Sequence, residues 1–126
     1  MRCEILLVEG AGGLLAPLGD SYYLLDIVSH LKGEVIVVAR NRLGTINHAL
    51  LTLRALETCP ESRPKVVLMG CKPADFSART NAQVLGDLRP STQVLEIEHL
   101  GSGASGLLRL KENAKKIKKS LARLCG

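Results

Sequence analysis

Four short apolar runs, each followed by a stretch with helical spacing, limit most strongly what this chain can fold into. The runs cover residues 4–9, 34–39, 65–70 and 93–98. They are continuous and rich in β-branched residues, which is typical of strands covered on both faces. Regular alternation of strand and helix predicts right-handed crossovers and a parallel sheet. We therefore expect an α/β domain, a Rossmann-like three-layer α/β/α arrangement with a mostly parallel sheet of about four strands.

Apolar residues recur at helical spacing between these runs. The spacing predicts helices over residues 21–31 and 45–57, and a weaker helix over 77–88 that Gly86 interrupts. A last helix is expected over 107–124. Its lysines should lie opposite an apolar stripe formed by Leu110, Ala114, Ile117, Leu121 and Leu124.

Size and composition narrow the classes of function. A chain of 126 residues has the usual length of one domain, so we expect residues 1–126 to form a single domain. The formal net charge is +5, but the only aromatic residues are Phe76, Tyr22 and Tyr23. Nucleic-acid sites usually pair basic residues with stacking aromatics. Because much of the excess charge lies on one helical segment, a solvated face is favoured and no nucleic-acid partner is expected.

The cysteines and the apolar runs bear on the compartment. Cysteines stand at positions 3, 59, 71 and 125, and their spacing matches no C-x-x-C pair or zinc site. No apolar run reaches the length needed to span a bilayer, and no leader peptide opens the sequence. Free thiols in a reducing cytoplasm, without a membrane partner, are therefore expected.

A glycine-rich turn follows the first apolar run. It consists of Gly10, Ala11, Gly12 and Gly13, directly after Glu9. In open parallel sheets ligands bind beyond the carboxyl ends of the strands, and small residues let backbone N–H groups approach phosphate oxygens. The carboxylate of Glu9 is a suitable hard ligand for Mg²⁺. The alternative is a tight connecting turn with a surface glutamate, and the glycines alone do not decide between the two.

The turn after the second run points to an anion. Thr45 is expected to be the N-cap of the following helix, whose free N–H groups would favour a carboxylate. Asn47 can add an amide hydrogen bond. His48 has no evident base or metal partner, and a histidine in a first helical turn is more often a local hydrogen bonder than a catalyst.

These two turns carry a resemblance to a known family. The segment EGAGGLLAPL, which starts at Glu9, resembles the second signature of the dethiobiotin synthetases. The segment VVARNRLGTINH, which starts at Val37, resembles the third, in the same order and at the same separation. The similarity covers about residues 4–57, and beyond them only the topology matches. It implies a P-loop NTPase-like fold.

The resemblance also implies a reaction. The family closes the ureido ring of dethiobiotin from 7,8-diaminopelargonate, CO₂ and ATP. By this resemblance Glu9 is a Mg²⁺ ligand, and the turn of Gly10, Ala11, Gly12 and Gly13 lines the nucleotide and diamine site. The carboxylate end of the diamine would be bound by Gly44, Thr45, Ile46 and Asn47. In the family that turn serves the neighbouring subunit, which implies a homodimer or a higher homo-oligomer.

The chain also departs from the family. The family begins with a strand, a G-x-x-x-x-G-K-[ST] loop and a helix, and no such loop occurs in the 126 residues. Without it there is no cradle for the β- and γ-phosphates and no lysine to neutralise transferring charge. Met69 and Gly70 stand where the family has an adenine-contacting asparagine, and Glu98 where it has a proline.

Two interpretations follow from this departure. The first is a domain that lacks its first β-loop-α unit and is inactive alone, with the loop supplied by a separate chain or from upstream of Met1. The alternative is a non-catalytic protein that keeps the fold to bind a small carboxylate or other anion, or for assembly. Residues 101–106 match G-x-G-x-x-G. They are interpreted as a linker, with a substitute anion site as the alternative.

Overall fold

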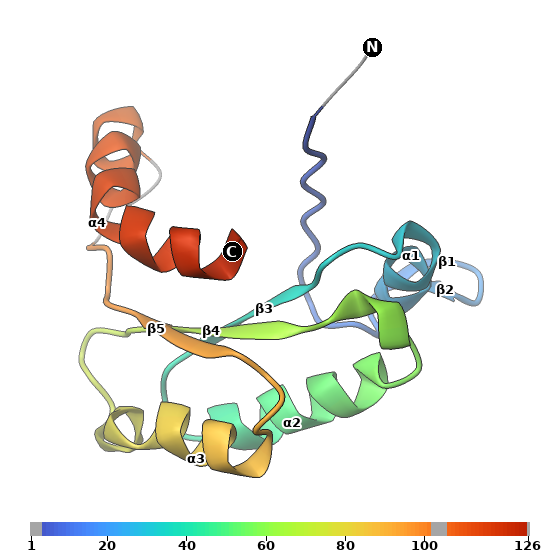
Figure 1. Ribbon diagram of the computed structural model, residues 1–126, viewed down its shortest axis with the longest axis horizontal. Helices are drawn as coiled ribbons and strands as arrows, with labels where there is room; N and C mark the ends of the chain where they lie inside the picture. Colours follow the sequence, from blue (N-terminus) through green and yellow to red (C-terminus); the bar gives the residue numbers. More distant parts are fainter. Residues whose placement is uncertain (1–3, 102–105, 126) are drawn as a thin grey trace.

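A three-stranded parallel sheet forms the centre of the computed structural model, which describes residues 4–101 and 106–125 (Figure 1). Its strands are β3 (Ile36–Arg40), β4 (Lys65–Met69) and β5 (Val94–Ile97), in the order β3-β4-β5. Both pairings are parallel, with Val38 opposite Val67 and Val67 opposite Leu95. The three predicted strands from the second run onward are therefore confirmed.

Helices cover both faces of this sheet (Figure 1). On one face lie α2 (Thr45–Leu56) and α3 (Asn81–Leu88), and on the other lies α4 (Leu107–Cys125). The core under α2 and α3 consists of Ala49, Leu53, Val66, Leu68 and Leu85. The cluster on the opposite face consists of Val67, Leu95 and Ile97, with Ile117 of α4 packed against it. The α/β fold class and its layers are thus as expected.

The N-terminal part contains a small hairpin that the sequence pattern does not predict. Strands β1 (Pro17–Gly19) and β2 (Tyr22–Tyr23) pair antiparallel and lead directly into α1 (Leu24–Leu31). The first amides of α1, those of Leu24 and Leu25, donate to carbonyls of residues 16 and 14 at 3.2 and 2.9 Å. The helix begins at Leu24, and not at residue 21 as predicted, because the hairpin occupies the residues before it.

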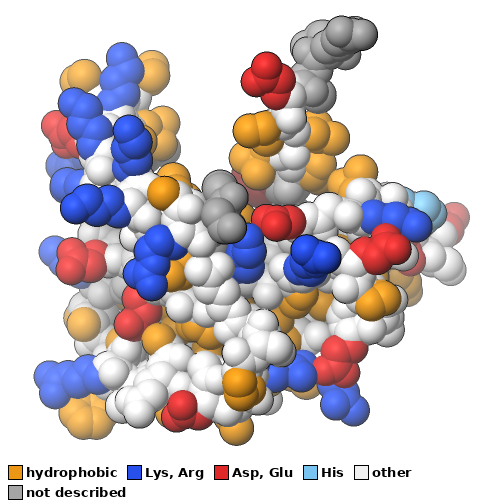
Figure 2. Space-filling view, viewed as in Figure 1, with side chains coloured by type: hydrophobic (Ala, Val, Ile, Leu, Met, Phe, Trp, Pro, Cys, Tyr) orange, Lys and Arg blue, Asp and Glu red, His pale blue; other side chains and the backbone are white. Residues whose placement is uncertain are grey.

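The predicted strand over residues 4–9 is wrong for this structure. The segment forms no strand, and among the described residues no backbone hydrogen bond joins residues 4–12 to another strand. Ile5, Leu6 and Leu7 are exposed, and Figure 2 shows apolar side chains gathered around this segment. A strand needs partners for its backbone N–H and C=O groups. The described parallel sheet therefore has three strands and not four.

Two further predictions are corrected at the helices. Residues 77–88 do not form one helix: a 3₁₀ turn, Phe76–Arg79, precedes α3, and the break falls at Thr80, whereas Gly86 lies within α3. The sheet-facing side of α4 runs through Asn113 and Ile117, while Leu110, Ala114 and Leu121 are exposed. The helix crosses the sheet beside β5, so leucines on its flank have nothing to pack on.

Other predictions have simpler outcomes. The central residues of the G-x-G-x-x-G match, 102–105, lie outside the described residues. Of the four cysteines, Cys59 and Cys71 are described as free thiols. In the part of the chain that the structure describes, no helix combines the length and the apolarity needed to cross a bilayer.

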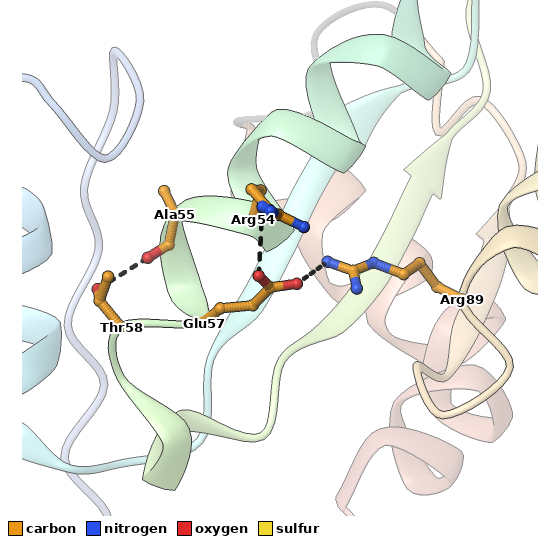
Figure 3. A network of polar contacts seen from close by, with 5 residues as sticks. All are labelled: Arg54, Ala55, Glu57, Thr58 and Arg89. Atoms are coloured by element: carbon orange, nitrogen blue, oxygen red, sulfur yellow. Dashed lines mark hydrogen bonds and ion pairs between the residues drawn. The ribbon is translucent and has the colours of Figure 1, made fainter.

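An ion pair joins the ends of the two helices on the same face (Figure 3). The Glu57 carboxylate, just after α2, accepts a 2.6 Å bond from the Arg89 guanidinium after α3 and lies 3.4 Å from Nε of Arg54. The hydrogen bond from Arg89, followed by the charge of Arg54, lowers the pKa of Glu57 below its ordinary value. Because the pair is partly exposed, it links the ends of α2 and α3 but contributes little to the free energy of unfolding.

Two leucines of α2 provide a test of the core. Leu53 is 3% exposed and Leu51 is 61% exposed. Leu53→Ala should lower the free energy of unfolding by about 2–5 kcal/mol, because it leaves a cavity, and Leu51→Ala should change it by about 0.5 kcal/mol or less. Urea titrations of both variants measure the difference, and equal losses would contradict the packing of α2 on the sheet.

The Glu57 ion pair predicts a pH dependence. Because the folded pKa is lowered, its contribution is present above the ordinary pKa and is lost as pH falls through the folded value. Glu57→Gln should therefore be less stable than the parent at neutral pH, and the difference should shrink below the ordinary pKa and vanish below the lowered pKa of the folded state. Urea midpoints from pH 7 down to 3 measure it. Glu112→Gln is the control, since Glu112 forms no ion pair among the described residues.

Candidate functional site

The turn between β3 and α2 is shaped by a glycine. Gly44 has a φ of +91°, a left-handed conformation that side-chain-bearing residues rarely adopt, and it is the N-cap of α2. The His48 amide donates to the Gly44 carbonyl at 3.2 Å, and the Thr45 amide donates to the Arg42 carbonyl at 3.1 Å. The prediction of Thr45 as N-cap is therefore wrong. Gly44 takes that position because it alone tolerates the backbone angle, and Thr45 begins the helix.

The first turn of α2 keeps two unused donors. Among the described residues, the amides of Ile46 and Asn47 have no hydrogen-bond acceptor. Such first-turn N–H groups, reinforced by the helix dipole, favour an anion. The side chains of the two residues point elsewhere: Ile46 packs against the apolar core, and Asn47 is exposed. Their predicted role in carboxylate binding therefore rests on their backbone.

A hollow of about 250 Å³ lies beside this turn, along β3 and the start of α2. Thr45 is only 4% exposed, yet it lines the hollow, and its hydroxyl makes no hydrogen bond within the described part of the chain. Arg40, Arg42 and His48 also line it, and in that same part neither arginine forms an ion pair. The hollow thus offers a hydroxyl and two cationic side chains, and an anion with an apolar tail matches this chemistry.

The hollow follows the outer edge of the sheet. Residues 37–40 of β3 line it, and no described strand pairs with this edge. Val38, on the face of β3 opposite the α2 core, is 64% exposed. An apolar strand edge left open in this way is usually covered by another element.

The sequence pattern does not reveal a cluster of polar residues behind the turn. Asn41 and Asn81 are both buried, and Nδ2 of Asn81 donates to Oδ1 of Asn41 at 2.9 Å. Nδ2 of Asn41 donates to Glu96 Oε1 at 3.0 Å and to the carbonyl of Ala78 at 3.2 Å. These residues come from the ends of different strand-helix units. Their only sequence signal is the position of Asn41, directly after the apolar run that forms β3.

Asp75 joins the same cluster from the segment after β4. Its carboxylate accepts from the hydroxyl and the amide of Ser77, at 2.6 and 2.9 Å, and interacts with the amide of Leu43. These hydrogen bonds, that of the Ser77 hydroxyl foremost, lower the pKa of Asp75 below its ordinary value. The carboxylate therefore stays ionised and keeps accepting from the turn at neutral pH.

The glycine-rich turn lies apart from this hollow. Glu9, Gly10, Ala11, Gly12 and Gly13 are all exposed, and no hydrogen bond or ion pair of the described residues joins them to residues 41–48. Gly10 lies against α1, where an added Cβ would overlap a methyl carbon of Leu24.

The metal site predicted at Glu9 has one carboxylate. No group of three His, Cys, Asp or Glu side chains in the described residues could hold a metal ion. A lone carboxylate suits Mg²⁺ only when phosphate oxygens and water complete the coordination sphere. Glu9 as a Mg²⁺ ligand therefore stays a prediction.

Comparison with known proteins agrees with these features. The family model described as "AAA domain" matches residues 1–102. None of the solved structures matches the chain significantly.

Several curated relatives bear the name ATP-dependent dethiobiotin synthetase. That of Rhizorhabdus wittichii is 39% identical over 98 residues, which cover 78% of this chain and 46% of the relative. The synthetase of Endomicrobium trichonymphae is 38% identical over 97 residues, which cover 76% of this chain and 44% of the relative. The synthetase of Lawsonia intracellularis is 60% identical over 53 residues, which cover 42% of this chain and 26% of the relative.

The chain spans less than half the length of these relatives. The family model nevertheless covers most of the chain, and the relatives share one name. Together with the parallel sheet and the glycine-initiated helix after β3, this match shows that the chain belongs to the AAA domain family and, within it, to the dethiobiotin synthetases.

Proposed function

We propose that this chain supplies the carboxylate-binding part of a dethiobiotin synthetase, which closes the ureido ring of 7,8-diaminopelargonate with CO₂ and Mg²⁺-ATP. The observation that supports the proposal is Thr45, a buried residue at the wall of a cationic hollow, whose hydroxyl makes no hydrogen bond among the described residues. The unbonded amides of Ile46 and Asn47 follow it in the same helical turn.

The chemistry assigns a binding role to these residues. One amine of the substrate adds to CO₂ as a carbamate, a phosphoryl group activates the carbamate oxygen, and the second amine displaces phosphate and closes the ring. Holding the carboxylate end fixes where the two amines lie, and such positioning accelerates ring closure. ATP supplies the phosphoryl group. Glu9 would hold the Mg²⁺ together with the phosphate oxygens.

The phosphate cradle must come from outside the 126 residues, because they contain no G-x-x-x-x-G-K-[ST] loop. We propose that it comes from residues upstream in a longer chain or from a separate chain. The open edge of β3, with the exposed Val38, supports an added strand at this place. Under this proposal the chain alone binds the substrate carboxylate without turning it over.

A second copy of the chain is also part of the proposal. Leu43 lines the hollow and is largely exposed, as is Val38 on the adjoining strand. Apolar residues at the rim of a binding hollow suit a homodimer contact, since one subunit would then close the site of the other.

The alternative is a protein that binds a small carboxylate without catalysis. It is favoured by Met69 and Gly70 at the end of β4, where the resemblance places an adenine contact. The amide of Gly70 donates to the carbonyl of Ile97 at 2.7 Å, so this N–H group is not free to bind adenine.

Thr45 provides the test of carboxylate binding. Thr45→Val removes the hydroxyl at constant volume, and a lost hydrogen bond to a charged group costs about 1.5–3 kcal/mol. The dissociation constant for 7,8-diaminopelargonate, measured by calorimetry, should rise roughly tenfold or more. Thr52→Val is the matched control, because Thr52 also lines the hollow but its hydroxyl already donates to the His48 carbonyl at 2.9 Å.

Two outcomes would contradict this assignment. The first is equal losses of affinity in the Thr45 and Thr52 variants. The second is that the matching diamine without its carboxylate binds as tightly as 7,8-diaminopelargonate, because the amines and not the carboxylate would then carry the affinity.

An assay for dethiobiotin formation tests whether the reaction needs a phosphate-binding loop from outside the 126 residues. The chain with 7,8-diaminopelargonate, bicarbonate and Mg²⁺-ATP should give no dethiobiotin by mass spectrometry. Co-expression with the part of the Rhizorhabdus wittichii relative that precedes its matched residues should restore product, and Glu9→Gln should lower it. Product from the chain alone, above that of its own Glu9→Gln variant, would contradict the proposed need for an external phosphate loop.

A further inference from the structure

The polar cluster behind the α2 turn has a use beyond packing. Three polar groups of the turn are bonded: the Asn41 amide to the Met69 carbonyl at 2.7 Å, the Asn41 side chain to Asn81, and the Arg42 carbonyl to Asn81 at 3.4 Å. The Leu43 amide also interacts with the Asp75 carboxylate. All these partners lie in or after β4. The segment after β4 therefore sets the position of the turn after β3.

We propose that Asn81 is a positioning residue for the carboxylate site. Its Nδ2 lies within hydrogen-bond distance of Oδ1 of Asn41, the Arg42 carbonyl and Oγ of Ser77, at 2.9, 3.4 and 3.3 Å. Asn81 does not line the hollow. It acts through the turn, which carries Gly44 in its left-handed conformation and so directs the amides of Ile46 and Asn47.

The physical basis is the cost of leaving buried polar groups unpaired. Asn41 and Asn81 are 5% and 3% exposed. Removing Asn81 would leave the buried Oδ1 of Asn41 without its donor, and a buried group in that state seeks another partner. The Arg42 carbonyl would lose its contact with Nδ2 and keep its bond from the Thr45 amide. The nearest relief is rotation of the Asn41–Gly44 turn, which would misdirect the first amides of α2.

This inference rests on the proposed function, because it concerns the same carboxylate site. The variant is Asn81→Ala. Its control is Leu85→Ala, one turn further along α3, where Leu85 is 1% exposed in the apolar core and has no bond to the turn. The control should lose global stability without touching residues 41–44. Both are compared where urea titration shows each fully folded.

Two measurements separate positioning from general destabilisation. The dissociation constant for 7,8-diaminopelargonate should rise about tenfold in Asn81→Ala and stay within about twofold of the parent in Leu85→Ala. Hydrogen exchange by NMR should be at least tenfold faster for the amides of Asn41, Leu43 and Thr45 in Asn81→Ala, beyond the change set by global unfolding.

The outcomes are distinct. Unchanged affinity in Asn81→Ala, or an equal loss in both variants, would overturn the positioning role. Should the parent chain bind no 7,8-diaminopelargonate, the proposed function fails, and the exchange rates alone decide the inference. Faster exchange at the three amides only in Asn81→Ala then supports the hold of Asn81 on the turn, and unchanged exchange overturns it.

Discussion

Parallel hydrogen bonding on both sides of β4 is the constraint on which the rest of the structure depends. β4 bonds to β3 on one edge and to β5 on the other, and Val66 and Leu68 at its centre are fully buried. Parallel pairing brings the carboxyl ends of all three strands to one side of the sheet. The turns that carry Asn41, Asp75 and the end of β5 meet there for that reason alone. The polar contacts that join these turns to one another, such as that between Asn41 and Asn81, are a consequence of this alignment.

The elements that could be predicted are those with a local signal. The runs in β3, β4 and β5 are mainly apolar, since each strand is covered on at least one face, and α2 has regular apolar spacing. The run at residues 4–9 has the same local signal but forms no strand here. Strand formation also requires a partner edge, and that information lies elsewhere in the chain or outside it. The sequence pattern therefore indicates that residues 4–9 favour a strand, but it does not indicate which strand they would pair with.

The candidate site divides in the same way. The turn at residues 44–47 could be proposed as a site because its residues are contiguous and resemble a family signature. The cap was misassigned because threonine is a preferred capping residue, whereas the backbone angle at position 44 requires glycine. The Asn41–Asn81 bond joins residues separated by forty positions and has no periodic signal. Such a contact emerges only when the sheet has placed two loops side by side.

The open edge of β3 has a consequence for the meaning of stability in this protein. An edge that is satisfied only when a second polypeptide segment adds to it contributes binding free energy to folding. If that segment lies on another molecule, the melting temperature becomes a function of concentration, and dilution acts as a denaturant. In that case the same edge sets how much folded protein a cell maintains, because folding then requires both partners to be made in matching amounts.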